Sequence, residues 1–287
     1  MNRPAYVTPA ALHNFIQHAL QEDIGEGDHS SLAAIPATTR QTAQLLVKDR
    51  GRLAGMEVAA EIFRFYDSSL TVNTLLQDGD DIVPGQIALT VSGSARAILA
   101  TERLVLNCMQ RMSGIATYTH RLNQILRGTR TQLKDTRKTT PNFRLLEKWA
   151  VAIGGGLNHR FALYDMIMLK DNHIDMAGGI RAALERTHAY VRTLPRPLSI
   201  EIETRNLAEV HDVLTVGGVN TIMLDNFSLE HLREAVKLIN GRFATEASGG
   251  ITEDTLRAVA ETGVDYVSVG ALTHSVKSLD LSLKAVR

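Results

Sequence analysis

Apolar residues recur with two different periods in the first part of the chain, and each period predicts its own kind of element. Alternation at every second position predicts strands, whereas recurrence at every third or fourth position predicts helices with one buried face. We expect helices over 8–21 and 56–66, strands over 41–48, 70–76 and 87–91, and two helices over 94–112 and 115–126 separated at Ser113-Gly114. Short strands beside helices predict an α+β sandwich domain over residues 1–113.

From residue 131 onward the pattern becomes a regular alternation of strands and helices. The predicted strands end at Asp135, Leu169, Glu203, Leu224, Ala247 and Val269, and helices are expected over 206–216, 229–239 and 253–262. The later units repeat at about 22 residues, which is typical of β/α barrels. An open doubly wound sheet is the alternative, but no G-x-G-x-x-G sequence follows a strand. We therefore expect an α/β protein whose residues 114–287 form an incomplete β/α barrel, with the last residues free to return to the N-terminal domain.

Composition and charge limit the classes of partner, and the cellular location, that we expect for this protein. Lys plus Arg and Asp plus Glu each total 31, so the formal net charge of zero gives no electrostatic case for nucleic acid. The chain has no apolar run of about 18 residues and no N-terminal signal pattern, so we expect no membrane partner and a cytoplasmic location. Cys108 is the single cysteine, lies in an apolar helical pattern and is expected to be a buried thiol.

Cationic side chains cluster at three places where predicted strands or a glycine run end. The clusters are Arg137-Lys138, His159-Arg160 and Lys170. A strand–helix–strand unit would bring Arg137, Lys138 and Lys170 to one edge of a parallel sheet. Arginine offers a planar fork for carboxylate or phosphate, and lysine offers a compact charge. Any one of these residues alone would be read as a solvated surface charge, but their recurrence at strand ends predicts an anion-binding site.

Carboxylates follow in the later strands. Glu201 and Glu203 alternate with isoleucines, so both point to the same face of one strand, and Asp225 ends the next strand. Acids at the mouth of a barrel can bind Mg²⁺ or the hydroxyl groups of a ribose. Whether Glu201 or Glu203 faces the ribose stays open from the pattern alone.

A glycine-containing turn supplies a candidate phosphate site. Ser248, Gly249 and Gly250 precede Thr252, a good N-cap residue for the next helix, and Gly270 follows the next strand. Glycines let backbone N–H groups approach a phosphate, and the helix terminus favours its charge. Read alone, Ser-Gly-Gly indicates only a turn, but late loops of barrels often form phosphate sites.

Three motifs in this order carry a family resemblance. They are Asp-Thr-Arg-Lys-Thr at 135–139, Gly-Gly-Gly-x-Asn-His-Arg at 154–160 and Leu-Lys-Asp-Asn-His at 169–173. Over nearly the whole chain, the sequence resembles quinolinate phosphoribosyltransferase, also called nicotinate-nucleotide pyrophosphorylase (carboxylating). The resemblance implies a transferase of de novo NAD biosynthesis. It would convert quinolinate and phosphoribosyl pyrophosphate to nicotinate mononucleotide, pyrophosphate and carbon dioxide, with Mg²⁺ bound to the substrate.

The resemblance also implies roles for individual residues. Lys138, Lys170, Glu203 and Asp225 would be catalytic, and no metal ligand is assigned to the protein itself. The implied substrate-binding set is Arg103, Arg137, Lys138, His159, Arg160, Lys170, Glu203, Asp225, Ser248, Gly249, Gly250 and Gly270. In the family, the arginine that matches Arg103 comes from the neighbouring chain, so we expect a homodimer with shared active sites. A charge pair between Arg103 and Glu102 is the alternative for this arginine.

Two other functions are compatible with such a barrel. One is a relative in the same superfamily, either a nicotinate phosphoribosyltransferase or the homologue associated with molybdenum transport. The intact Asp-Thr-Arg-Lys-Thr and Asn-His-Arg pair favours recognition of two carboxylates instead. The other is a non-catalytic regulator that binds a sugar phosphate. Such a regulator would be expected to lose part of the acid set or the lysines, and this chain retains them.

Overall fold

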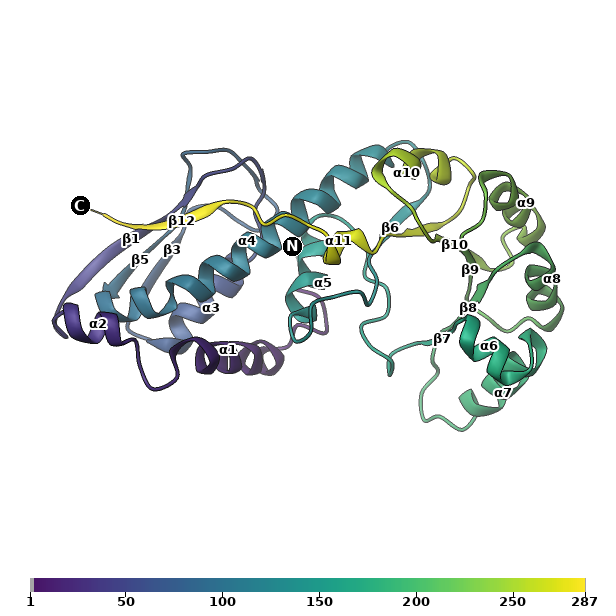
Figure 1. The fold of residues 1–287 in the computed structure, drawn as a ribbon, viewed down its shortest axis with the longest axis horizontal. Helices are drawn as coiled ribbons and strands as arrows, with labels where there is room; N and C mark the ends of the chain where they lie inside the picture. The colour runs from purple at the N-terminus through teal and green to yellow at the C-terminus, as the bar shows by residue number, and fades with distance from the viewer. Residues whose placement is uncertain (1–2, 287) are drawn as a thin grey trace. The chain divides into compact units, whose positions relative to one another are not determined.

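The computed structural model describes residues 3–286, which fold into two compact units (Figure 1). The first unit combines residues up to 120, residues 138–155 and the segment from 271 onward. The second unit consists of residues 121–137 and 156–270. The family-implied cations Arg137 and Lys138 therefore lie on either side of a unit boundary.

A four-stranded antiparallel sheet forms the centre of the first unit. Its strand order is β12 (Leu281–Ala285), β1 (Arg40–Val47), β5 (Ile87–Ser94) and β3 (Thr71–Thr74). In β1 the buried residues Ala43, Leu45 and Val47 alternate with less buried ones, as the period of two predicts. A separate two-stranded ladder joins β2 (Gly51–Arg52) to β4 (Asp81–Ile82).

Six helices of the described chain accompany this sheet in the first unit. They are α1 (Pro9–Ile24), α2 (His29–Ala34), α3 (Met56–Tyr66), α5 (Arg144–Ile153), α11 (Ala271–His274) and most of α4 (Ala95–Ile125). Thr8 caps α1, because its hydroxyl accepts the backbone N–H of Ala11 at 3.1 Å. The α3 helix has the bounds that the apolar periodicity predicts, and it buries Ile62 and Phe63 completely.

The predicted break at Ser113-Gly114 is wrong, because α4 continues through both residues. The Ser113 hydroxyl donates to the carbonyl oxygen of Ala54 at 3.1 Å and accepts the Ala54 N–H at 2.9 Å. A Cβ atom at Gly114 would clash with the carbonyl oxygen of Lys277. The glycine thus serves close packing of the backbone and does not end the helix. The domain boundary predicted at residue 113 falls inside this helix.

A six-stranded parallel sheet forms the second unit. Its order is β6 (Gln132–Lys134), β11 (Tyr266–Ser268), β10 (Ala244–Ser248), β9 (Thr221–Asp225), β8 (Ile200–Thr204) and β7 (Ile167–Leu169). Each predicted strand end falls within a residue or so of the observed one. Among residues 3–286, no ladder joins β7 to β6, so the barrel stays open. The predicted fold class is confirmed.

Five helices accompany these strands. They are α6 (Asp171–Ala177), α7 (Ile180–Val191), α8 (Leu207–Val216), α9 (Leu229–Ile239) and α10 (Glu253–Ala260), and Figure 1 shows α7, α8 and α9 on the outer side of the sheet. Ile202 of β8 is fully buried, while Glu201 and Glu203 point to the other face of the same strand. Because all six strands are parallel, their carboxyl ends meet at one edge. From residue 3 to 286, no helix combines the length and apolar content needed to cross a membrane.

Candidate active site

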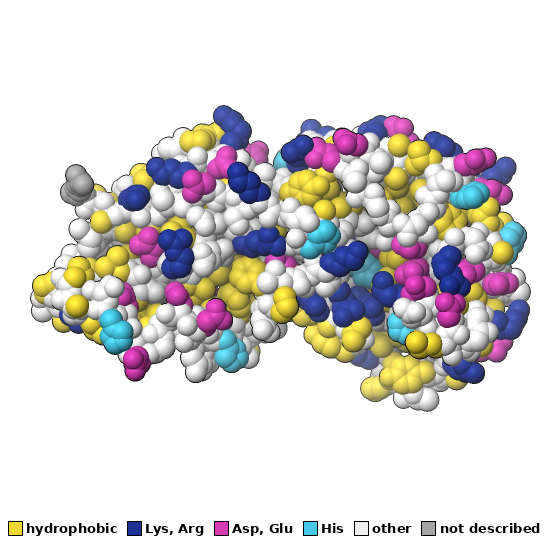
Figure 2. All heavy atoms as spheres, in the orientation of Figure 1, with side chains coloured by type: hydrophobic (Ala, Val, Ile, Leu, Met, Phe, Trp, Pro, Cys, Tyr) yellow, Lys and Arg dark blue, Asp and Glu magenta, His cyan; other side chains and the backbone are white. Residues whose placement is uncertain are grey.

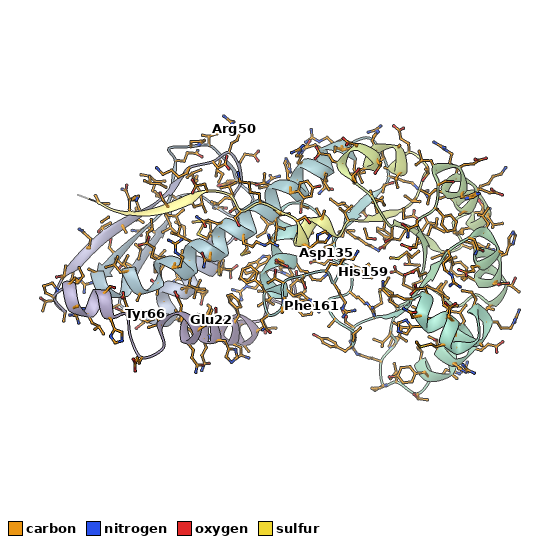
Figure 3. The ribbon with its side chains drawn as sticks, in the orientation of Figure 1. Glu22, Arg50, Tyr66, Asp135, His159 and Phe161 are labelled. Atoms are coloured by element: carbon orange, nitrogen blue, oxygen red, sulfur yellow. The ribbon has the colours of Figure 1, made fainter. Side chains whose placement is uncertain are left out.

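Asp135 anchors the segment that carries the second cationic cluster. It follows β6, is completely buried and accepts hydrogen bonds from Asn158 Nδ2 at 2.7 Å and from the His159 backbone N–H at 2.8 Å. Figure 3 shows Asp135 and His159 close together. The backbone of Leu157 forms a parallel bridge beside β6, which places residues 157–160 along the end of that strand. The acid therefore positions the histidine and the arginine that follow it.

Arg160 is a buried cation with unused hydrogen-bonding capacity. It is 9% exposed, and its Nη1 donates to the carbonyl oxygen of Met166 at 3.2 Å. Its Nε atom is buried and has no hydrogen-bond partner in the described chain. Burial lowers the pKa of Arg160, and the nearby Arg137 guanidinium lowers it further, while Glu201 and Asp165 act in the opposite direction. Two adjacent guanidinium groups with a free donor form a site that an anion would stabilise.

The His159 imidazole has a defined tautomer. Its Nδ1 accepts the backbone N–H of Arg160 at 2.8 Å, so the proton of the neutral ring resides on Nε2. Nε2 lies 3.1 Å from Glu201 Oε2 and 3.6 Å from Glu246 Oε1. The other oxygen of Glu246 accepts from Lys134 Nζ at 2.6 Å. These four side chains form one network, which the second cationic cluster joins through His159.

Three of these side chains have the spacing of metal ligands. Ligand atoms of His159, Glu201 and Glu246 lie within 4.8 Å of one another, which is close enough to hold a metal ion. A histidine that binds metal through one nitrogen usually donates the other N–H to an acceptor. In His159 the Nδ1 atom accepts instead, and the Nε2 lone pair is used by its proton. The donor set fits a hydrogen-bond network and does not fit a metal centre.

Lys134 and Glu246 were not among the residues expected in the site. Burial raises the pKa of Glu246, and the adjacent Glu201 raises it further, whereas Lys134 and His159 oppose the shift. The Lys134 ammonium also lies 3.5 Å from the centre of the Tyr266 ring, a cation–π contact. A sequence signal exists for Glu246, because a charged residue is unusual in the middle of a short parallel strand that is buried on both faces, as β10 is.

A second group of charges lies at the ends of β7, β8 and β9. Lys170 Nζ is 3.6 Å from Glu203 Oε2. Burial raises the pKa of Glu203 and Lys170 lowers it, while the nearby carboxylates of Asp225 and Asp171 raise it. Figure 2 shows basic and acidic side chains side by side on the face near β7 and β8. Of the two alternating acids in β8, Glu203 thus lies beside Lys170, whereas Glu201 contacts His159.

The turn after β10 has a backbone conformation that lets a ligand approach the main chain closely. Gly249 and Gly250 have φ angles of 92° and 59°, which L side chains rarely adopt. A Cβ atom at Gly249 would also clash with the side chain of Asn226. The Asn226 backbone N–H donates to the carbonyl oxygen of Ser248 at 2.9 Å, and its Nδ2 donates to Asp225 at 2.6 Å. Asn226, which the sequence analysis did not select, therefore joins the acid of β9 to the glycine turn.

Two family models together match most of the chain. Residues 28–113 match the model of the quinolinate phosphoribosyl transferase N-terminal domain, and residues 115–284 match that of its C-terminal domain. The chain belongs to the quinolinate phosphoribosyltransferase family. The predicted enzyme class, a carboxylating nicotinate-nucleotide pyrophosphorylase of NAD biosynthesis, is confirmed.

Relatives in the quinolinate phosphoribosyltransferase family match nearly the whole of this chain. Quinolinate phosphoribosyltransferase [decarboxylating] 1b of Nicotiana tabacum is 46% identical over 95% of this chain and 82% of its own length. The probable nicotinate-nucleotide pyrophosphorylase [carboxylating] of Bacillus subtilis is 40% identical, with 95% and 92% covered. The crystal structure of NadC from Streptococcus pyogenes superposes with a TM-score of 0.91 at 40% identity, covering 98% of this chain and 99% of that one.

The similarity to a nicotinate phosphoribosyltransferase is limited to the fold. The crystal structure of human nicotinic acid phosphoribosyltransferase superposes with a TM-score of 0.64, but its sequence identity is 14%. It covers 98% of this chain and 74% of its own chain. Membership in the quinolinate phosphoribosyltransferase family rests on the far higher identities above.

Not every residue implied by the quinolinate phosphoribosyltransferase resemblance lies in the second unit. The structure brings Arg137, His159 and Arg160 together, and it groups Lys170 with Glu203 and Asp225. Lys138 belongs to the first unit, as does Arg103, which is exposed on α4 and makes no ion pair within residues 3–286. The expected roles of both stay predictions from the motif. Gly270 is the last residue of the second unit, after β11.

His173 has a local structural role in this member of the family. Its Nδ1 accepts the backbone N–H of Lys170 at 3.0 Å, which satisfies a donor at the start of α6. The hydrogen bond links the position of the lysine backbone to the fourth residue of the Lys-Asp-Asn-His motif.

Proposed function

We propose that quinolinate binds where Arg137, His159 and Arg160 converge, with its carboxylates paired to the two guanidinium groups. The observation that carries this assignment is the buried Arg160 Nε, a charged donor with no partner within residues 3–286. A buried donor left unpaired costs about 1–3 kcal/mol, so a carboxylate that accepts from it would recover that loss. The planar fork of arginine favours such an anion over a neutral ligand.

Phosphoribosyl pyrophosphate would occupy the remaining strand ends. We assign the ribose hydroxyls to Glu203 and Asp225, whose negative charges also stabilise the positive charge that develops at the ribose C1. Lys138 and Lys170 would neutralise the departing pyrophosphate. The terminal phosphate of the sugar would lie against the backbone of Ser248, Gly249, Gly250 and Gly270, and the positive φ angles of Gly249 and Gly250 permit a close approach.

The chemistry then proceeds without a covalent enzyme intermediate. The ring nitrogen of quinolinate attacks C1, and the bond from C1 to pyrophosphate breaks. The alkylated ring accepts the electron pair released when the bond to the 2-carboxylate breaks, carbon dioxide departs, and the ring carbon takes a proton. Cys108 is unsuited as a nucleophile, because complete burial raises the pKa of its thiol to about 12. Catalysis would rest on positioning and preorganised charge.

We assign Mg²⁺ to the substrate and not to a protein cage. When bound to pyrophosphate, the ion supplies additional neutralisation of the leaving group. This assignment is supported by the tautomer of His159, which leaves the buried His159–Glu201–Glu246 group without a free imidazole lone pair for a metal. Lys170 supplies positive charge at the strand ends from the chain itself.

We further propose a cytoplasmic homodimer in which Arg103 reaches the site of the neighbouring subunit. The exposed position of Arg103 on α4 and its lack of an ion pair among the described residues support this role over the pair with Glu102. The family resemblance supplies the two-fold arrangement. A symmetric dimer would then contain two equivalent shared sites.

The decisive experiment compares two substrates. The protein is incubated with phosphoribosyl pyrophosphate, Mg²⁺ and either quinolinate or nicotinate, and mononucleotide and carbon dioxide are measured. We expect turnover of quinolinate and little turnover of nicotinate, because nicotinate lacks one carboxylate and leaves the buried Arg160 Nε without an acceptor. Comparable rates with both acids would instead indicate a nicotinate phosphoribosyltransferase.

A further inference from the structure

The loop that carries Lys138 is held at two points of its backbone and side chains. Thr273 Oγ1 donates to the carbonyl oxygen of Lys138 at 2.7 Å. Two residues further on, the Thr140 backbone N–H and hydroxyl both donate to the carboxylate of Glu147, at 3.0 and 2.9 Å. Lys138 and Thr140 themselves are exposed, so burial of their side chains does not fix this loop.

Glu147 is an unusual anchor, because its carboxylate is completely buried in the first turn of α5. A buried carboxylate is costly unless it is paired and hydrogen-bonded. Arg111 provides the charge, with its Nε at 3.1 Å and its Nη2 at 2.9 Å from Glu147 Oε1. Thr140 supplies the remaining donors. Four hydrogen bonds thus reach one buried anion, and two of them come from the loop.

Arg111 closes the connection between the two anchors. Its Nη1 donates to the carbonyl oxygen of Val276 at 2.9 Å, and its Nη2 contacts the carbonyl oxygen of Thr273. The path therefore runs from Lys138 through Thr273 and Arg111 to Glu147, and returns to the loop at Thr140. We call these five residues the anchoring ring. All five belong to the first unit.

We propose that Arg111, Glu147, Thr140 and Thr273 are positioning residues that hold Lys138 ready for the departing pyrophosphate. The inference rests on the proposed role of Lys138. An ammonium on a flexible stem stabilises a transition state best when its backbone is already fixed, because little reorganisation remains at the moment of reaction. The ring supplies that fixation from buried charge, although the lysine itself is exposed.

The test uses matched pairs at the two hydroxyl groups. Thr140→Val and Thr273→Val each delete one hydrogen bond of the ring with little change in shape, whereas Thr140→Ser and Thr273→Ser retain the hydroxyl. We expect each valine variant to lose about tenfold in kcat/KM for phosphoribosyl pyrophosphate, in line with one hydrogen bond to a charged or buried acceptor. The serine variants should stay near wild type, and KM for quinolinate should change little. Thr262→Val, which removes a buried hydroxyl that donates to Val259 of α10, serves as the control.

Two further measurements separate positioning from general damage. Hydrogen exchange of the backbone amides over 138–143 should be faster in the valine variants and unchanged in the serine variants and in Thr262→Val. In a Lys138→Ala background, Thr140→Val should cause little additional loss, because both changes act on the same group. Thr140 is exposed, so its variants are expected to fold even if those of buried Thr273 do not.

The outcomes distinguish the inference from the proposed function. Amide exchange and kinetics at the wild-type level in Thr140→Val would overturn the ring as a positioning device. The same holds if Thr140→Val lowers kcat/KM as much in the Lys138→Ala background as in the wild type. A fully active Lys138→Ala enzyme would remove the proposed role of Lys138 in catalysis. The amide exchange would then decide by itself whether the ring orders the loop.

Discussion

The Nδ1 atom of His159 accepts the backbone N–H of Arg160 at 2.8 Å. A backbone N–H can only donate, so this single contact fixes the protonation pattern of the ring. It directs the Nε2 proton toward Glu201 and leaves no imidazole lone pair for a metal. The donated hydrogen bonds therefore run from the Arg160 amide through the ring to the Glu201 carboxylate, while Lys134 donates to Glu246 from the other side.

The first prediction concerns this tautomer. Nitrogen NMR of labelled histidine should show His159 protonated on Nε2 and unprotonated on Nδ1 at neutral pH, with the signal assigned by its loss in His159→Gln. Added Mn²⁺ should not broaden this signal selectively, because the donor set does not fit a metal. A proton on Nδ1, or selective broadening at His159, would contradict the described network.

Replacing Arg160 should weaken quinolinate binding without destabilising the fold. Burial and Arg137 lower the pKa of Arg160, so the charged guanidinium is less stable in the folded protein than in the unfolded chain. Arg160→Gln should therefore leave the melting temperature unchanged or raise it slightly. Quinolinate affinity should fall by about tenfold to a hundredfold, because a charge-assisted pair is lost.

Calorimetric titration with quinolinate measures this loss of affinity, and Arg196→Gln is the matched control. Arg196 is an exposed arginine whose Nη2 donates to the carbonyl oxygen of Tyr164 at 3.1 Å. Its replacement should leave quinolinate affinity unchanged. Unaltered affinity in Arg160→Gln would remove Arg160 from the quinolinate site.

Glu203 should make the protein less stable as pH rises. Burial raises its pKa in the folded state, so the folded protein keeps a proton over a range in which the unfolded chain has lost it. The free energy of unfolding therefore falls as pH increases from the unfolded pKa of about 4.3 to the raised folded value. Glu203→Gln should weaken this decrease and give a higher melting temperature at neutral pH.

The same variant should lose activity, since a neutral amide cannot stabilise the charge at C1. The expected drop in kcat is about a hundredfold, comparable to removal of one preorganised electrostatic contact. Glu234→Gln, at an exposed position of α9, should alter neither property. Identical pH profiles of stability for Glu203→Gln and the wild type would show that burial does not perturb Glu203.

Mixed dimers test the proposed sharing of active sites. Arg103→Ala and Lys170→Ala should each be inactive as separate proteins. If Arg103 acts in the neighbouring subunit's site, a mixed dimer contains one site with both changes and one with neither. Random exchange makes about half of the dimers mixed, which restores about a quarter of wild-type activity. Absence of recovery after verified subunit exchange would place Arg103 in its own chain's site or in none.

The strand ends could be predicted because their signal is local. A run such as Ile200–Thr204, followed by a capped helix at Asn206, shows its period and its end within a few residues. Parallel strands then bring separate ends to one edge by a general rule of the fold. For this reason Arg137, Lys170, Glu203 and Asp225 could be selected without a structure.

The network around Lys134 and Glu246 and the continuity of α4 could not be predicted from local sequence patterns. Lys134 pairs with Glu246 across 112 residues, and no local period reports such a contact. Likewise, Gly114 is read as a break from its propensity, whereas its packing against Lys277 decides its role. Sequence patterns therefore predict which residues reach an edge of the sheet more readily than which buried charges meet beneath it.

The pairing of β12 with β1 has a consequence for how the chain acquires its structure during synthesis. The antiparallel sheet begins with residues near the N-terminus, yet one of its edges is completed by Leu281–Ala285. Residues 156–270 of the parallel sheet emerge from the ribosome as one continuous stretch before that edge strand exists. Since segments can fold as they emerge, β1 must wait with an open edge while the later sheet assembles. The antiparallel sheet thus starts before the parallel sheet along the chain and is completed after it.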